Sequence, residues 1–193
     1  MRRREVVVGL GAAAVLAGCG QSKFRSYSGP PVTSIVVYKA ERQMFLMHGT
    51  EVLRGFEFEL GFAPTGHKTE EGDGRTPEGA YFIDRKNPNS RYHLSIGISY
   101  PNAFDVAQAR ARGVKPGGDI FIHGTPRAFR GEDDWTWGCL AVSDREIEDI
   151  YAMVEVGTPI FIYESRAAQR AMLTRPEPLP MAEGAEASLD PGA

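Results

Sequence analysis

Short stretches in which apolar and polar residues alternate restrict the fold of this chain more than any other sequence feature. In Arg54–Leu60, the side chains of Phe56, Phe58 and Leu60 fall on one face and two glutamates fall on the other. Tyr92–Ile98 alternates in the same way, with a second face that is small and polar. A period of two predicts β-strands that bury one face. Such strands need partners, so the chain is expected to build a sheet.

The remaining apolar runs are short and separated by turn residues. Strands are also expected at residues 34–38, 43–47, 80–84, 119–122 and 158–163, and residues 140–142 form a further short apolar run. Most of them follow one another at hairpin spacing, without a helix between each pair. This order favours a mainly antiparallel β-sheet or sandwich over a doubly wound α/β fold.

Two short helices and one long loop complete this outline. A helix is expected over Asn102–Arg112, with Asn102 as its N-cap. Ser143 and Glu146 form the capping-box pattern that begins a second helix. Gly61–Gly79 is rich in glycine, proline and charge, and loops of this length in a compact domain are usually functional or mobile.

Length and charge exclude several classes of protein. The 193 residues suit one domain with extensions, and 42% hydrophobic content is enough for a core. The formal net charge is −3 and no basic block stands out, so nothing indicates a nucleic-acid partner. No run of 18 apolar residues predicts a membrane-spanning helix.

The N-terminal residues follow the pattern of an export signal. The basic run Arg2–Arg4 precedes the apolar run Val6–Val15, and Leu-Ala-Gly-Cys follows at residues 16–19. This ending resembles a bacterial lipoprotein box, in which the cysteine, here Cys19, is lipidated and becomes the mature N-terminus. The alternative is an ordinary cleaved signal with a chance cysteine. The resemblance implies an exported, membrane-anchored lipoprotein that faces the periplasm or cell wall.

These features divide the chain into four parts. Residues 1–18 are expected to be a lipoprotein signal peptide and 19–31 a polar tether. A single domain is expected over residues 32–164. Residues 165–193 form a C-terminal extension that is expected to be disordered from about residue 175, because it offers little to bury. We expect the protein to be a monomer.

The stretch Ile122–Val142 holds the residues best suited to chemistry. His123 ends an apolar run, and Cys139 follows sixteen residues later after Gly138. A lipidated Cys19 would leave Cys139 without a disulfide partner. A cysteine becomes a nucleophile when a neighbouring histidine takes its proton, and backbone N–H groups near Gly138 and Cys139 could form an oxyanion hole. The alternative is a buried structural cysteine beside a core histidine.

The motifs of this region resemble the L,D-transpeptidase catalytic domain, also called the YkuD domain. That family carries His-Gly followed some fifteen residues later by Ser/Thr-x-Gly-Cys, here His123-Gly124 and Thr136-Trp137-Gly138-Cys139. The segment Gly74–Tyr81 resembles the family's Thr-Pro-x-Gly-x-Tyr/Phe motif. The resemblance covers Val32–Tyr163 and implies a mainly β, sandwich-like fold with short helices. It also implies a cysteine enzyme that needs no metal and no cofactor and acts on peptidoglycan stem peptides.

By this resemblance, Cys139 is the nucleophile and His123 its proton acceptor. Cys139 would form a thioester with a tetrapeptide stem, and a second amine would resolve it to give a 3→3 cross-link or attach a protein to the wall. Water in place of the amine would make the protein an L,D-carboxypeptidase or peptidoglycan hydrolase. The third alternative for the function is a non-catalytic lipoprotein that binds the cell wall. Substrate-binding positions are expected at Gly124, Thr136, Trp137, Gly138 and His93.

Two departures from the family pattern leave the reaction open. Trp137 stands where many members have histidine, and Ala141 stands where many have an arginine that helps to hold the stem. Related proteins with Gly-Cys-x-Ala include some that hydrolyse wall linkages. Arginines that could supply the missing charge are Arg75, Arg85, Arg91 and Arg127.

Overall fold

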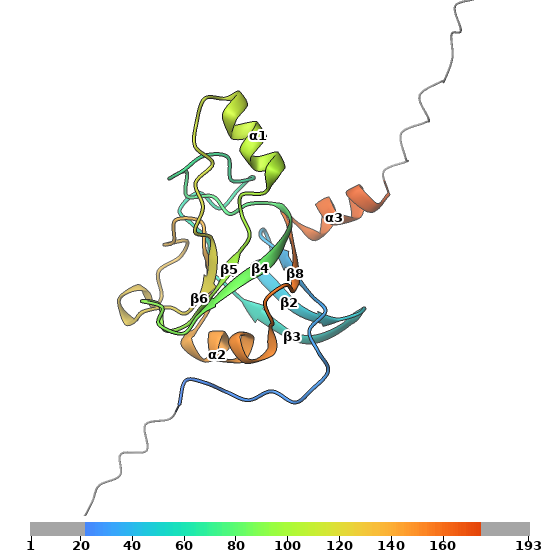
Figure 1. Cartoon of the computed structure of the whole chain (residues 1–193), viewed down its shortest axis with the longest axis vertical. Coiled ribbons are helices and arrows are strands. Elements are labelled where there is room, and N and C mark those ends of the chain that lie inside the picture. The colour runs from blue at the N-terminus through green and yellow to red at the C-terminus, as the bar shows by residue number, and fades with distance from the viewer. Residues whose placement is uncertain (1–21, 175–193) are drawn as a thin grey trace, which may run out of the picture.

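Eight strands and three α-helices make up residues 22–174, the part of the chain that the structure, a computed structural model, describes (Figure 1). The strands are β1 (Ser34–Tyr38), β2 (Gln43–His48), β3 (Glu51–Glu57), β4 (Gly79–Asn87), β5 (Ser95–Ile98), β6 (Phe121–His123), β7 (Leu140–Ala141) and β8 (Pro159–Tyr163). The helices are α1 (Ala103–Ala111), α2 (Asp144–Met153) and α3 (Arg166–Leu173), and a 3₁₀ turn η1 covers Arg127–Phe129.

The strands form one sheet in the order β3-β2-β1-β8-β4-β5-β6-β7. Strand β4 joins its two halves, because its first residues pair with β8 and its later residues pair with β5. The register shifts between Ile83 and Arg85, a bulge that bends a sheet at this kind of junction. Pairing is antiparallel except between β1 and β8 and between β6 and β7. The prediction of a mainly antiparallel β fold with short helices is therefore confirmed.

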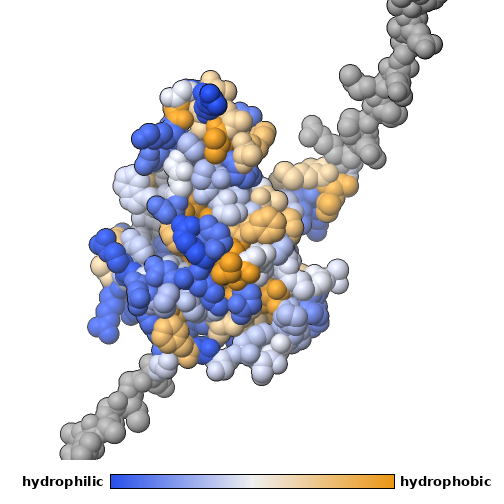
Figure 2. All heavy atoms as spheres, in the orientation of Figure 1, coloured by the Kyte–Doolittle hydropathy of each residue, from blue (hydrophilic) through white to orange (hydrophobic). Residues whose placement is uncertain are grey.

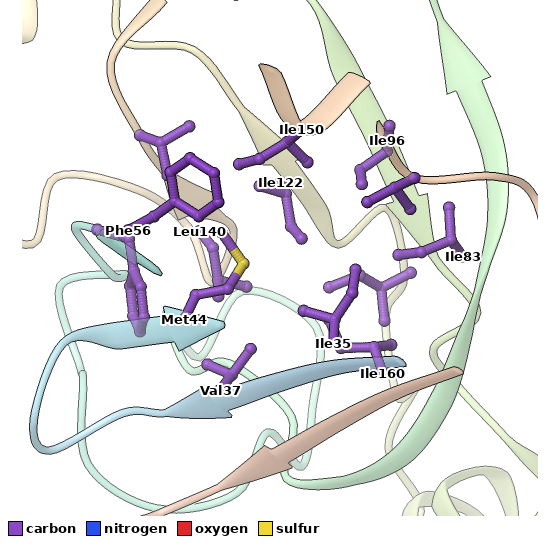
Figure 3. Packing of buried hydrophobic residues seen from close by; sticks show 14 of the residues in the cluster. Ile35, Val37, Met44, Phe56, Ile83, Ile96, Ile122, Leu140, Ile150 and Ile160 are labelled. Carbon is purple, nitrogen blue, oxygen red and sulfur yellow. The ribbon is translucent and has the colours of Figure 1, made fainter. Parts of the chain in front are cut away.

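The core lies between the halves of the curled sheet and α2 (Figure 3). Ile35 and Val37 of β1, Ile122 of β6 and Ile150 of α2 are each fully buried and point toward one another. Burying one such side chain contributes about 1.5–3 kcal/mol. The core holds β6 and β7 in place through Ile122 and its neighbour Leu140. This matters for the candidate site, because His123 ends β6 and Cys139 immediately precedes β7.

Helix α2 begins as its sequence predicts. The Ser143 hydroxyl accepts the Glu146 N–H, and the Glu146 carboxylate accepts the Ser143 N–H at 2.8 Å. The predicted capping box is therefore confirmed. The helix packs against β5 and β6, while α1 lies at the opposite end of the domain (Figure 1).

Two alternating segments become shorter strands than the sequence predicts. Phe56, Phe58 and Leu60 are buried, as the alternation of Arg54–Leu60 predicts. Strand β3 nevertheless ends at Glu57, because Glu59 no longer pairs with β2 and pairs with Ala141 instead. Strand β5 begins only at Ser95, because His93 has a φ of +70°, which no regular strand allows. His93 therefore does not lie on the strand face where the alternation puts it.

The segment 22–31, expected as a tether, runs along the domain beside α2 (Figure 1). Arg25 donates to Glu148 at 2.9 Å and to Asp149 at 2.6 Å, and the ring of Phe24 lies 6.2 Å from that of Tyr151. The predicted signal peptide and Cys19 lie outside the described residues, as does the tail beyond residue 174. Among the helices of residues 22–174, none has the length and apolar character that a membrane crossing requires.

Helix α3 was not expected from the sequence. It begins at Ser165, whose hydroxyl accepts the Ala168 N–H, and it packs against β8. Met172 and Leu173 are 64% and 78% exposed, and Figure 2 shows hydrophobic colour along this helix as well as in other patches of the same face.

Candidate active site

His123 ends β6 and is held by the residue that follows it. Its side chain is buried, and Nδ1 lies 2.8 Å from the carbonyl oxygen of Gly124. A carbonyl oxygen can only accept, so Nδ1 carries the proton and Nε2 keeps a free lone pair. The bond therefore fixes the tautomer that a general base needs.

Aromatic side chains enclose the imidazole. The Tyr92 ring stacks on it at 4.4 Å between centroids, and the Trp135 ring meets it at 5.6 Å and 60°. Burial lowers the pKa of His123, although the hydrogen bond to Gly124 acts in the opposite direction. The imidazole is therefore neutral at pH 7.

Cys139 immediately precedes β7, level with Phe121 at the start of β6. Strands β6 and β7 pair in parallel, with Ile122 opposite Leu140 and His123 opposite Ala141. Continued by one residue, this register places Cys139 opposite Phe121, two positions from the residue opposite His123. Cys139 and His123 then lie on the same side of the sheet, with Cα atoms about 8 Å apart by strand geometry. Ile122 and Leu140 point into the core, so the cysteine and histidine face away from it.

The thiol is partly buried and uncharged. Sγ lies 3.5 Å from the carbonyl oxygen of Asp119, to which it donates. Burial raises the pKa of the Cys139 thiol to about 11, although a backbone hydrogen bond with Phe121 acts in the opposite direction. The resting pair is therefore a neutral thiol and a neutral imidazole, and not a thiolate–imidazolium ion pair.

Thr136 and Gly138 hold the cysteine loop in shape. The Thr136 hydroxyl donates to the Cys139 carbonyl at 2.8 Å and accepts the Gly138 N–H at 3.1 Å. Gly138 has a φ of +111°, and a Cβ there would collide with the carbonyl of Arg75. The fully buried Thr76 donates to the Gly138 carbonyl at 2.8 Å. Thr136 and Gly138 thus act here as supports of the loop, whereas the sequence predicts them as substrate contacts.

One of the two N–H groups expected in an oxyanion hole is already used. The Gly138 N–H donates to the Thr136 hydroxyl at 3.1 Å, so in this structure it is not free to bind an oxyanion. In the described part of the chain, the Cys139 N–H has no acceptor, so it can still donate to an oxyanion formed beside Sγ.

A cavity of about 760 Å³ opens onto Cys139. Trp137 forms part of its wall and is 69% exposed, with the ring of Phe62 against it edge to face at 5.0 Å. An exposed tryptophan at the mouth of such a cavity offers a flat surface to a ligand. The cavity is lined by Lys68, Glu71, Gly72, Lys115, Pro116, Gly117, Gly118, Asp119, Trp137 and Cys139.

The structure does not bring His93 and Gly124 to this cavity. His93 Nε2 lies 2.8 Å from the Glu148 carboxylate of α2, and its side chain is not part of the cavity wall. Gly124 supplies the carbonyl that holds His123, and a Cβ on it would collide with Asp144. Both predictions of substrate binding are therefore without geometric support.

The arginines proposed to replace the missing charge are also absent from the cavity wall. The guanidinium of Arg85 lies 3.1 Å from the carboxylate of Asp119, which does line the cavity. The wall instead carries two lysines, Lys68 and Lys115.

Residues of the long loop were missed as parts of the site. The carboxylate of Asp73 accepts from Lys68 at 2.8 Å and from the N–H groups of Thr69, Glu70 and Arg75. Burial alone would raise the pKa of Asp73, but these bonds outweigh it and lower the pKa. The Thr-Pro motif indicated that Thr76 belongs to the site. No local sequence pattern indicated that Asp73 would be the residue around which the loop is hydrogen-bonded.

This arrangement suits acyl transfer by a thiol. A thiol and an imidazole with a free Nε2, brought close by the register of β6 and β7, are the two groups that such chemistry requires. His123 itself is not among the residues that line the cavity. Within residues 22–174, no group of three or more His, Cys, Asp or Glu side chains is placed to hold a metal ion.

Comparison with known proteins identifies the domain. The family model for the L,D-transpeptidase catalytic domain, YkuD, matches residues 32–162. YafK of Escherichia coli K12, which is named only provisionally as an L,D-transpeptidase, is 36% identical over 91 residues, or 46% of this chain and 32% of YafK. The chain thus matches about a third of that relative.

Solved structures share the fold. A variant of Pgp2, a helical cell shape determining protein from Campylobacter jejuni, aligns with a TM-score of 0.56 at 25% identity, over 72% of this chain and 49% of Pgp2. Bd1075 of Bdellovibrio bacteriovorus gives 0.51 at 25%, over 70% of this chain and 49% of Bd1075. The alignments span about half of each of these longer chains. The family model covers more than half of the present chain, and its residues include both His123 and Cys139. The chain therefore belongs to the L,D-transpeptidase catalytic domain (YkuD) family.

Proposed function

We propose that this protein is a peptidoglycan L,D-transpeptidase that acts through a thioester on Cys139. The observation that carries the proposal is the pairing of β6 with β7. This pairing brings His123, whose Nε2 is free, two residues in register from Cys139, which lines the cavity. Family membership makes peptide stems of the cell wall the first substrates to test. The domain alone is matched in the longer relatives, so their activities come to this chain only as a proposal.

The acylation step begins with attack of Sγ on the carbonyl carbon of the third residue of a tetrapeptide stem. A C–S bond forms while the thiol proton passes to His123 Nε2. The C–N bond to the terminal D-residue then breaks, and its nitrogen takes the proton back from His123. The products are a thioester and a free D-amino acid, and the oxyanion formed on the way can accept the Cys139 N–H.

The second step needs an amine from another stem or from a protein. Its nitrogen attacks the thioester carbon, His123 takes the amine proton, and the C–S bond breaks as the thiol is restored. A 3→3 cross-link or a wall-attached protein results. Because Pgp2 is described as determining helical cell shape, we also propose a role in cell-wall biogenesis and cell shape.

Hydrolysis of the thioester is the alternative favoured by one observation. Ala141 replaces the arginine of many family members, is almost fully buried, and uses its N–H and C=O on Glu59. It therefore offers the incoming stem no charge. With water as acceptor, the same first step would make the protein an L,D-carboxypeptidase or a hydrolase that frees wall-linked groups.

Purified sacculi distinguish these outcomes. The protein is incubated with them, and the muropeptides are separated, with the Cys139→Ala variant as control. New 3→3 dimers support the transpeptidase, whereas shorter stems without new dimers support the hydrolase. Muropeptides identical to those of the control, together with binding to sacculi, would leave only a non-catalytic wall-binding protein.

We propose further that a lipid on Cys19 anchors the domain to a membrane facing the periplasm or cell wall. The support is the lipobox-like ending of the N-terminal segment. Cells fed an alkyne-tagged fatty acid should label the wild-type protein, and Cys19→Ala should lose both the label and membrane sedimentation. Equal sedimentation of the two proteins would contradict the anchor.

A further inference from the structure

Lys68 is a buried cation that lines the cavity of Cys139. The residue is 2% exposed, and its ammonium donates to the Glu70 carbonyl at 3.1 Å and to the Asp73 carboxylate at 2.8 Å. An ammonium has three N–H donors, and no third acceptor lies among residues 22–174. A buried donor without a partner is costly, so this N–H is ready for an acceptor that enters the cavity.

The loop around Lys68 holds this ammonium in a fixed position. Asp73 accepts three backbone N–H bonds in addition to the bond from Lys68. Its negative charge is therefore shared among four donors, and it neutralises Lys68 only in part. A fixed and partly compensated cation binds an incoming anion without first having to be ordered.

Lys115 adds a second positive charge to the same wall. Its side chain is exposed, and within the described part of the chain no carboxylate lies within ion-pair distance of it. Its carbonyl accepts the Glu71 N–H at 2.9 Å, and that bond holds the Lys115 segment against the loop that carries Lys68. Two segments 47 residues apart in the sequence thus bring their lysines to one cavity.

The two acidic residues of the wall are exposed, whereas Lys68 is buried. Asp119 pairs with Arg85 at 3.1 Å on the surface, and Glu71 makes no ion pair in the described structure. Both carboxylates are therefore screened by water. The cavity wall thus carries two cations, of which Lys68 is the buried one, and two exposed carboxylates.

We propose that Lys68 and Lys115 form a subsite that binds a carboxylate of the acyl-donor peptide next to Cys139. The inference rests on the proposed function for the identity of the donor, and it assigns to these lysines the charge that Ala141 does not supply. Two carboxylates of a tetrapeptide stem have this chemistry. One is the α-carboxylate of the terminal residue, and the other is the free carboxylate of a diamino acid at position three.

The test measures peptide binding without turnover, in the Cys139→Ala protein. Three donors are titrated by calorimetry: the free acid, the peptide amidated at its C-terminus, and the peptide amidated at the diamino acid. One of the two amides should bind about fivefold more weakly than the acid, a difference of about 1 kcal/mol. Which amide loses affinity identifies the carboxylate.

Substitutions then locate the subsite. Adding Lys115→Ala should reduce the preference for the acid to less than twofold. Lys86→Ala, which removes a lysine that contacts Tyr151 and does not line the cavity, should keep the preference. Lys68→Gln should reduce the preference and Lys68→Arg should retain it, with melting curves to show that the loop still folds.

The outcomes separate this inference from the proposed function. A full preference for the acid in Lys115→Ala would overturn the subsite, and so would equal binding of all three donors or no binding at all. If the preference behaves as expected but the wild-type protein forms no thioester, then the subsite stands and the transpeptidase proposal fails.

Discussion

The neutral state of the Cys139–His123 pair predicts an unusual alkylation profile. Burial raises the pKa of the thiol to about 11 and lowers that of the imidazole, so neither residue charges the other at rest. Replacing His123 by alanine should therefore leave the reaction of Cys139 with iodoacetamide nearly unchanged at pH 8. The same variant should lose catalysis, because the imidazole is needed once a substrate is attacked.

The magnitude follows from the fraction of thiolate. At pH 8, a thiol of pKa about 11 is about one thousandth ionised, whereas an ordinary cysteine of pKa about 8.5 is about one quarter ionised. The more basic thiolate is intrinsically more reactive, by roughly tenfold over this pKa difference at a Brønsted slope of about 0.45. Cys139 should therefore react roughly 20-fold more slowly than a free cysteine peptide.

The assay follows alkylation by intact mass between pH 6 and 10.5. A Cys19→Ser background leaves Cys139 as the single thiol, Cys139→Ala serves as the blank, and N-acetylcysteine serves as the reference. The rate should rise about tenfold per pH unit from pH 6 to about pH 10, without a plateau in the range measured. A plateau below pH 8 that disappears in His123→Ala would show a thiolate–imidazolium pair and refute this reasoning.

Three further substitutions test the supports of the site. Thr76→Val leaves the buried Gly138 carbonyl unpaired and should lower the free energy of unfolding by about 1–2 kcal/mol in urea titrations; an unchanged midpoint would contradict the role of that bond. Gly138→Ala should cost about 3 kcal/mol or more through strain and collision, against about 1 kcal/mol for Gly49→Ala, which has positive φ but open space. Equal costs would refute the collision. The pKa of Asp73 is lowered on folding, so its stabilisation is complete above about pH 5 and is lost as pH falls through its folded pKa. The stability gap between wild type and Asp73→Asn should therefore narrow below pH 4 in thermal melts, and a constant gap would count against the bonds to Lys68.

Local patterns predicted the parts of the fold that local forces decide. The strands 34–38 and 158–163 and the capping box at Ser143 depend on side-chain alternation and on one short motif, and each forms close to where it was expected. Helix α3 was missed although Ala167, Ala168, Ala171 and Met172 form an apolar stripe at helical spacing, and none of its residues is buried in the domain.

Contacts between distant segments decided what the sequence did not reveal. His93 belongs to an alternating segment, but its positive φ and its bond to Glu148 on α2 take it away from the predicted face. The proposed role of Lys68 depends on its bond to Asp73 and on a cavity that it shares with Lys115. Neither feature produces a periodic pattern in the sequence. The motif spacing predicted that His123 and Cys139 come from neighbouring segments, and the pairing of β6 with β7 agrees with that placement, while their catalytic roles stay a prediction.

Intact mass spectrometry of the acylated protein tests the central claim most directly. The full chain is mixed with a tetrapeptide donor, quenched in acid after short times, and digested to locate the modification. The account predicts a mass increase on Cys139 equal to the donor without its terminal residue, absent in Cys139→Ala and strongly reduced in His123→Gln. An unmodified Cys139 in the wild-type protein, under conditions in which the donor is consumed or bound, would contradict it.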